Sequence, residues 1–228
     1  MDYRRYAIYF TPAPGPLTGL CSAWLGWDMS TGQTLAHPQV PGLPLPVAQI
    51  TETPRKYGLH ATMKPPFRLA EGASREMLDD ALADFCARHA AVTLDGLELA
   101  RLGRFLALRP LGDEGPLNAL AAATVRGFDA FRAPLTEPEM ARRRAAGLTP
   151  EQDALLRAWG YPYVMDQFRF HITLTGKLPV AQARQTAQAL TPLITPLLPA
   201  PFVIDALSLA GEDAEGRFHL ISRHAFTG

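Results

Sequence analysis

The sequence has few cysteines and no long hydrophobic run. Cys21 and Cys86 show no metal-ligand spacing and are too few for a disulfide framework, so we interpret both as reduced, buried thiols. No run approaches the roughly 20 apolar residues that span a membrane, and the most apolar stretch, residues 191–204, contains four prolines. The N-terminal residues lack the apolar core of a signal peptide. These absences favour a cytoplasmic protein without a membrane segment.

The sequence also lacks an excess of either charge. It has 22 basic and 22 acidic residues among 228, for a formal net charge of zero. Proteins that grip long nucleic acids usually carry a basic excess, because phosphate contacts dominate their affinity. A small substrate is therefore favoured over a polymer. The hydrophobic share of 47% is ordinary for a soluble globular protein of this length.

What the sequence does contain is a short strand with an unusual polar face. In residues 59–64 (LHATMK), apolar side chains alternate with His60, Thr62 and Lys64. Alternation at a period of two predicts a β-strand with one buried face. We expect Pro65 and Pro66 to end it, because proline cannot donate to a sheet ladder.

A second strand repeats this pattern 111 residues later. In residues 168–175 (FRFHITLT), His171, Thr173 and Thr175 alternate with apolar residues, and Arg169 lies on the same polar face. The spacing H-x-T is weak on its own. Its recurrence in two alternating strands is a stronger signal.

The surroundings of the two triplets also repeat. Each is followed by a predicted helix, a strand, and a further strand that begins with Gly-Arg-Phe, at residues 103–105 and 216–218. In the first copy, Ser74 is a suitable N-cap, and the helix has an apolar stripe made of Met77, Leu78, Ala81, Leu82, Phe85 and Cys86. The period is too long for a solenoid and predicts a duplicated lobe instead.

We therefore predict a single bilobal α+β domain spanning residues 1–228. Its lobes are expected to be related by a pseudo-two-fold axis, with antiparallel sheets flanking a central cleft. The first H-x-T unit covers residues of about 50–110 and the second about 161–228, with a helical insertion at about 116–160.

Two histidines and two threonines facing one cleft suit phosphoester chemistry without a metal or cofactor. Imidazole exchanges a proton near neutral pH, so His60 and His171 can act as general acid and base. The hydroxyls of Thr62, Thr173 and Thr175 and the Lys64 ammonium can bind the non-bridging oxygens of a phosphate. Which histidine is the acid stays open, as does the choice between hydrolysis and ligation or transfer.

Several stretches of the sequence resemble known families. HATMK and HITLTG resemble the paired H-x-[ST] signatures of the two-histidine phosphoesterase superfamily, which includes LigT-like cyclic phosphodiesterases. RYAIYFTP, RKYGLHATMKPPFRL, FRAP, WGYPYV and FRFHITLTG resemble the DUF1045 family encoded with phosphonate-degradation genes. The resemblance implies the bilobal fold, His60 and His171 as the catalytic pair, and Thr62 and Thr173 as phosphate ligands. The resemblance does not supply a substrate, although the genomic setting of the group suggests a phosphorylated or cyclic ribose intermediate of carbon–phosphorus bond cleavage. We expect a small cyclic phosphodiester, such as a nucleotide or ribose cyclic phosphate, as substrate.

Further candidates flank the two strands. Tyr57 and Arg169, with Arg5, Tyr161 and Tyr163, could hold a sugar, a base or a second phosphate, or could serve ordinary packing. The run Arg142–Arg144 suits phosphate binding or a solvated helix face, and its short length favours the latter. We assign His37, His89, His219 and His224 structural roles.

Two other kinds of function compete with a metal-free phosphoesterase. A zinc hydrolase needs three or four arranged ligands, and the sequence has no H-E-x-x-H, H-x-H or C-x-x-C motif. A non-catalytic nucleotide- or RNA-binding module could use the same cleft, although binding alone does not need two imidazoles. The sequence does not indicate an oligomeric state.

Overall fold

The computed structural model describes residues 2–228, and its helices and antiparallel sheets confirm the predicted α+β class. The strands are β1 (Arg5–Phe10), β2 (Trp27–Asp28), β3 (Gln33–Thr34), β4 (Ala61–Phe67), β5 (Val92–Leu94), β6 (Gly96–Leu102), β7 (Phe105–Leu111), β8 (Ile172–Thr173), β9 (Phe202–Ile204), β10 (Ala206–Glu212) and β11 (Phe218–Ala225). The α-helices are α1 (Pro16–Leu25), α2 (Val47–Ile50), α3 (Glu52–Arg55), α4 (Arg75–Ala87), α5 (Gly115–Gly127), α6 (Glu137–Arg144), α7 (Pro150–Trp159) and α8 (Val180–Ile194). Short 3-10 helices cover Asp129–Phe131, Met165–Gln167 and Thr195–Leu197.

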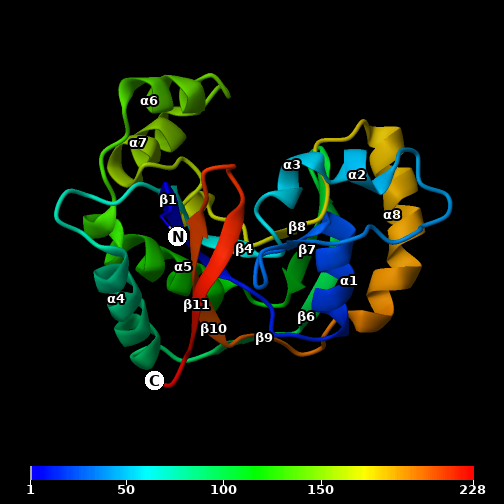
Figure 1. Ribbon diagram of the computed structural model, residues 1–228, viewed down its shortest axis with the longest axis horizontal. Coiled ribbons are helices and arrows are strands. Elements are labelled where there is room, and N and C mark those ends of the chain that lie inside the picture. Colours follow the sequence, from blue (N-terminus) through cyan, green and yellow to red (C-terminus); the bar gives the residue numbers. More distant parts are fainter. Residues whose placement is uncertain (1) are drawn as a thin grey trace.

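A seven-stranded sheet with the order β11-β10-β1-β4-β8-β7-β6 forms the centre of the molecule. The two H-x-T strands, β4 and β8, are neighbours in this sheet and pair at Ala61 and Ile172. We call this junction of β4 and β8 the seam. Figure 1 shows α1, α8, β6 and β7 on one side of the seam, and α4, α5, β10 and β11 on the other. The seam therefore brings the two predicted polar strands together.

The order of elements repeats along the chain, but the copies interlock in space. β4 is followed by α4, β5, β6 and β7, and β8 is followed by α8, β9, β10 and β11. The hairpin β6–β7 of the first series pairs with β8, whereas β10 of the second pairs with β1, the other neighbour of β4. Each helix also packs on the hairpin of the other series. Helix α4 of the first series contacts β10 and β11, and α8 of the second contacts β6 and β7. The unit boundaries that we drew from the sequence stay a prediction.

Hydrophobic clusters cover both faces of the sheet, and the two clusters differ in size. The larger cluster packs α1, α4, α5 and α8 against the face that carries Phe10, Ala61 and Ile172. A smaller cluster on the opposite face gathers around Tyr9 and Phe218. The H-x-T polar side chains lie on this second face, because they alternate with Ala61 and Ile172. The site is thus supported from behind by the main core.

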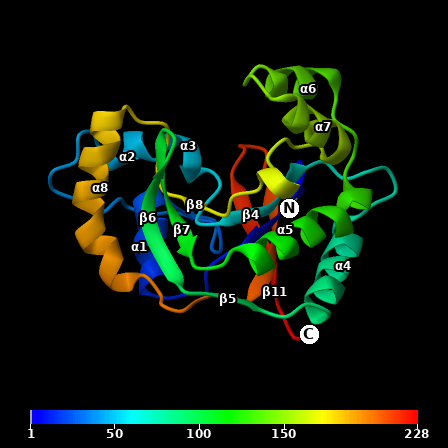
Figure 2. The ribbon, with the colours of Figure 1, turned by 180° about the vertical axis from the view of Figure 1, so that it is seen from behind.

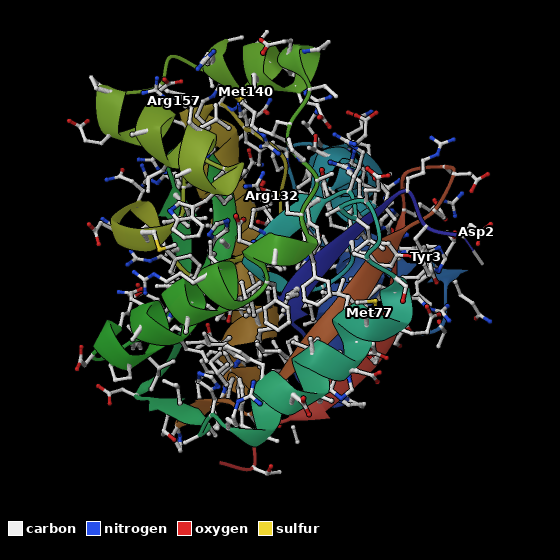
Figure 3. The ribbon with its side chains drawn as sticks, turned by 90° about the vertical axis from the view of Figure 1, so that its left-hand side faces the viewer. Asp2, Tyr3, Met77, Arg132, Met140 and Arg157 are labelled. Carbon is white, nitrogen blue, oxygen red and sulfur yellow. The ribbon has the colours of Figure 1, made fainter. Side chains whose placement is uncertain are left out.

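Helix α4 confirms most of its predicted stripe. The Ser74 side chain accepts a hydrogen bond from the Met77 amide, as expected of an N-cap. The stripe positions buried in the core are Leu78, Leu82, Phe85 and Cys86. Met77 was expected among them but is 53% exposed, and Figure 3 labels it near one end of α4. It lies in the first turn of the helix.

The two H-x-T strands differ in length from the sequence prediction. β4 continues through Pro65 and Pro66 to Phe67 and is still paired with β1. β8 covers only two residues. The register of β4 with β1 shifts between Lys64 and Phe67, so the prolines lie at an irregularity of the ladder, where a residue without an N–H group is tolerated. The expected stop at the prolines is therefore corrected.

Both cysteines are buried and free, as predicted, and burial raises the pKa of Cys21 to about 12 and that of Cys86 to about 11. Among residues 2–228, no helix combines the length and the hydropathy needed to cross a membrane.

Candidate active site

The register of the β4–β8 seam builds a quartet from the two triplets. Ala61 and Ile172, the middle residues of the triplets, stand directly opposite each other. In an antiparallel pair, the flanking positions then match as His60 with Thr173 and Thr62 with His171, all on the opposite face from Ala61. A local two-fold axis passes through the pair. Each histidine thus lies across from the threonine of the other strand.

Both histidine rings are oriented by the same backbone contact. His60 Nδ1 lies 3.0 Å from the carbonyl oxygen of Gly58, and His171 Nδ1 lies 2.7 Å from that of Arg169. A carbonyl oxygen only accepts, so Nδ1 donates in each ring and Nε2 is left to exchange a proton with a ligand. Gly58 has a φ of +68°, and a Cβ there would lie 2.8 Å from Met29 Cβ, so this backbone position requires glycine.

Burial lowers the pKa of both histidines. The pKa of His60 falls to about 4, chiefly through desolvation, and the charge of His171 acts in the same direction. Burial also lowers the pKa of His171, against the opposing effect of its bond to the Arg169 carbonyl. The coupling shows that the two imidazoles are close enough for one charge to disfavour the other. Burial thus favours the neutral form of both rings, and the larger shift belongs to His60.

The quartet opens into a cleft of about 480 Å³ that is lined by cations. His60, Thr62, Thr173, Thr175 and Tyr57, all predicted from the sequence, are among the lining residues. The lining cations are Arg5, Lys56, Arg142, Arg143 and Lys177, and no Asp or Glu is among the described residues that line it. His171 is not a lining residue itself, but its ring lies 5.6 Å from that of Phe105, which is. A chain of zero net charge thus has a locally positive cleft.

Lys64 does not face this cleft. Tyr9 pairs with Thr62 but Ile8 pairs with Lys64, so two residues of β4 stand against one step of β1. This bulge turns Lys64 to the core face. Its ammonium donates to the Val125 carbonyl at 3.0 Å and lies 3.3 Å from Asp129 Oδ1. We therefore remove Lys64 from the predicted phosphate ligands.

Two more predicted residues have their polar groups engaged elsewhere. Thr175 lines the cleft, but its hydroxyl donates to the Gly176 carbonyl and accepts from the Leu106 amide. Arg169 does not line it, and its guanidinium donates to the carbonyls of Asp166 and Phe168. Thr175 thus supports the end of β8, and Arg169 holds the turn that leads to His171.

The cleft also contains residues that the sequence pattern did not single out. Tyr9 stacks on His60, with ring centroids 3.9 Å apart, and fixes that ring from the side of β1. Arg142 and Arg143 line the cleft, although we expected their run to be a solvated helix face. β1 is buried on both faces from Tyr6 to Phe10, so its sequence has no alternation that could single out Tyr9. For the two arginines, only the position of α6 in the folded structure shows that they line the cleft.

The described residues offer no obvious metal centre. Among residues 2–228, no three His, Cys, Asp or Glu side chains converge where they could share an ion.

The sequence was compared with models of protein families. Residues 62–219 match the family described as "Protein of unknown function (DUF1045)". The chain belongs to the DUF1045 family. The matched range covers well over half of the chain and includes Thr62, His171 and Thr173, while His60 lies just before it.

Relatives of this DUF1045 chain carry the name ribose 1,5-bisphosphate phosphokinase PhnN. The protein from Janthinobacterium sp. (strain Marseille) is 41% identical over 220 residues, which are 93% of this chain and 48% of that protein. The protein from Laribacter hongkongensis (strain HLHK9) is 37% identical over 175 residues, or 76% of this chain and 40% of that protein. The DUF1045 chain thus spans about half the length, or less, of the curated relatives it matches.

Solved structures with similarity to the DUF1045 chain include phosphoesterases. E. coli LigT complexed with 3'-AMP is 17% identical, with a TM-score of 0.45 over 100% of both chains. A crystal structure described as a phosphoesterase is 16% identical, with a TM-score of 0.43 over 100% of both. The family assignment above rests on the family model, and the fold class on the sheet itself.

Proposed function

We propose that this protein is a metal-independent two-histidine phosphoesterase that acts on a small cyclic phosphodiester, such as a nucleotide or ribose cyclic phosphate. The observation that carries the proposal is the His–Thr quartet of the β4–β8 seam, with both Nδ1 atoms bonded to a carbonyl two residues back. Such an arrangement leaves both Nε2 atoms free for proton transfer, with His60 lining the cationic cleft and His171 beside the lining residue Phe105.

The proposed reaction uses the two histidines in opposite protonation states. Neutral His60 accepts a proton from water while the water oxygen attacks phosphorus. Protonated His171 donates its proton to the ester oxygen as the P–O bond to that oxygen breaks. One P–O bond forms and one breaks, the ring opens to a phosphomonoester, and solvent resets the two protons. We assign the base to His60 because the charge of His171 and burial both disfavour a proton there.

The threonines and cations stabilise the charge that develops on phosphorus. In our proposal, the hydroxyls of Thr62 and Thr173 donate to the two non-bridging oxygens, one from each strand. The ammonium of Lys177, which lines the cleft beside Thr175, adds positive charge. Fixed donors and charges of this kind supply much of the rate enhancement of enzymes, because they need no reorganisation during reaction.

A phosphorylated ribose is the substrate class that we favour. The cleft volume of about 480 Å³ suits a small ligand, and its five cations suit phosphate. The name of the two relatives also contains a ribose phosphate, and the resemblance to the DUF1045 group associated with phosphonate degradation points the same way. The present chain has no G-x-x-x-x-G-K-[ST] loop, so we do not extend phosphokinase activity to it.

The alternative is a non-catalytic module that binds a nucleotide or RNA in the same cleft. The cation lining favours it equally well, because binding needs charge and not proton transfer. Substitution of the two histidines distinguishes the two proposals, because only the phosphoesterase needs them for proton transfer.

The test compares the wild type with His60→Ala and His171→Ala on 2′,3′-cyclic nucleotides and ribose cyclic phosphates. We expect either substitution to lower kcat by roughly 10²–10⁴-fold, the usual contribution of a general acid or base, with the fold retained. His89→Ala is the control, since its Nδ1 also contacts a backbone carbonyl, that of Phe85, but outside the cleft. Tight nucleotide binding without turnover would support the binding module, and unchanged rates in both variants would remove the histidines from the mechanism.

A further inference from the structure

The helices α6 and α7 form an arm, residues 137–159, that stands out from the rest of the molecule (Figures 1 and 2), and α6 contributes lining residues to the cleft. The arm is docked on the molecule by two arginines. Arg68 donates to the Pro134 carbonyl and pairs with Glu139 of α6, and Arg132 donates to the Ala158 carbonyl of α7. Figure 3 labels Arg132 below the arm. None of the residues of α6 itself is buried, so this helix contributes little to the core.

Three consecutive arginines on α6 have different surroundings. Arg144 faces outward and pairs with Asp153 of α7 at 2.6 Å. Arg142 and Arg143 line the cleft instead. Within residues 2–228, neither of them forms an ion pair with a carboxylate. The helix thus turns two unpaired cations toward the site and one paired cation away from it.

Arg143 is held in place without being neutralised. Its guanidinium lies 4.8 Å from the centre of the Tyr161 ring, a cation–π contact. Its Nε is shielded from solvent and has no hydrogen-bond partner among the described residues. Burial lowers the pKa of this guanidinium, and the charges of Arg142 and Arg5 act in the same direction. A buried donor without a partner is costly, and an anion would remove that cost.

The positive region continues past the arginines of the arm. A small cavity of about 20 Å³ shares Arg5, Arg142 and Arg143 with the cleft and adds Arg68 and Arg132. Three of the five have acidic partners, namely Glu212 for Arg5, Glu139 for Arg68 and Asp129 for Arg132. The uncompensated charge of this region is therefore concentrated at Arg142 and Arg143.

We propose that Arg142 and Arg143, the latter supported by Tyr161, form a second anion subsite, and that the substrate carries a terminal phosphomonoester in addition to the phosphodiester at the histidines. The inference rests on the proposed function and specifies its substrate class. Guanidinium groups match a phosphate dianion in charge and offer paired N–H donors. The arm is then a specificity element that reads the second phosphate.

The experiment compares 2′,3′-cyclic AMP with its 5′-phosphorylated form as substrates. We expect the wild type to prefer the 5′-phosphorylated form by roughly ten- to a hundred-fold in kcat/KM, mainly through KM, as a charged hydrogen-bonded contact contributes. Arg142→Gln and Arg143→Gln should each reduce this preference about ten-fold. Arg144→Gln, one residue further on the same helix, should keep it. Equal preference in all four proteins, or none in the wild type, would overturn the subsite.

A binding measurement separates failure of the subsite from failure of the proposed function. If neither nucleotide is turned over, the phosphoesterase proposal fails, but calorimetry with the same two nucleotides still tests the arginines. Tighter binding of the 5′-phosphorylated form that Arg143→Gln abolishes would support the subsite. Equal affinities of the two nucleotides for the wild type would contradict it. Melting temperatures near that of the wild type are expected for Arg142→Gln and Arg144→Gln, because no residue of α6 is buried as a whole. The melting temperature of Arg143→Gln is measured as well, because this variant also loses the contact with the Tyr161 ring.

Discussion

His60 and His171 are alike in geometry and unlike in electrostatics. Both donate from Nδ1 to the carbonyl two residues back, so the tautomer and ring orientation repeat. Burial lowers the pKa of each, but only His60 lies against Tyr9, at a centroid distance of 3.9 Å, and has its pKa lowered to about 4. A difference in surroundings thus distinguishes two groups that the sequence pattern treats as equal.

We expect a bell-shaped dependence of kcat/KM on pH, with its maximum on the acid side of neutrality. The base His60 must be neutral, so activity rises as pH increases through its pKa of about 4. The acid His171 must be protonated, so activity falls as pH increases through its pKa, which burial places below 6.5. Initial rates on a cyclic nucleotide from acid to alkaline pH test this. A rate that climbs steadily into the alkaline range would contradict the assignment.

The same histidine should make the fold sensitive to acid. His60 binds a proton less readily in the folded state than in the unfolded state, so stability is complete above pH 6.5 and falls as pH decreases toward about 4. The loss should be roughly 3–4 kcal/mol in total, since the pKa falls from 6.5 to about 4 and each unit of pKa difference corresponds to about 1.4 kcal/mol. Urea unfolding near neutral pH and near pH 4.5 measures it.

His60→Asn is the matched variant, because asparagine can donate to the Gly58 carbonyl but does not titrate. It should lose less stability than the wild type over the same interval. An equal loss in both proteins would mean that other groups account for the acid sensitivity.

A β-bulge in β4 sets the limit of what the sequence could predict at the scale of elements. Alternation correctly predicted that His60 and Thr62 share a face, and the structure brings both to the cleft. It failed two residues later at Lys64, because the bulge depends on pairing with β1 and has no local sequence signature. The prediction that the arginines of α6 form a solvated helix face was wrong for a related reason. A charged helix face has the same sequence pattern whether it meets solvent or a cleft.

Lys64, which the bulge turns to the core face of β4, has a structural role there. Val125 is in the last turn of α5, where carbonyl oxygens lack partners within the helix, and the Lys64 ammonium donates to one of them. We expect Lys64→Met to lower the free energy of unfolding by about 1–3 kcal/mol, and to change kcat/KM little. Denaturant unfolding and steady-state kinetics on the same samples test both parts.

Lys177→Met is the matched comparison, because Lys177 lines the cleft and is exposed. It should show the opposite pattern, with a raised KM and nearly unchanged stability. A raised KM for Lys64→Met at wild-type stability would restore the sequence-based interpretation of Lys64 as a phosphate ligand.

At the scale of the whole molecule, the interlocked hairpins join the two halves of the chain. β8 obtains its neighbours β4 and β7 from the first half of the sequence, and β10 pairs with β1 from the N-terminus. The repeated order of elements was readable from the sequence. The exchange of hairpins was not, because pairing between distant strands leaves no mark on either strand alone.

We therefore expect that neither fragment of a chain cut at Gly147 folds alone. Gly147 lies in the turn between α6 and α7, so a cut there interrupts no helix or strand. Fragments 1–146 and 147–228 should each give poorly dispersed NMR spectra, and mixing them should restore the dispersion. A single fragment with a cooperative unfolding transition would show that the halves are independent.

The local two-fold axis between Ala61 and Ile172 has a consequence for regiochemistry. A 2′,3′-cyclic phosphate has two ester oxygens, and turning it half a turn about the axis changes which of them faces the acid His171 and leaves. The quartet therefore cannot by itself select which product isomer forms. That choice belongs to the asymmetric walls of the cleft, the arm arginines on one side and Phe105 and Lys177 on the other. We expect substitutions in those walls to alter the ratio of 2′- to 3′-monophosphate even when they leave the chemistry at phosphorus intact.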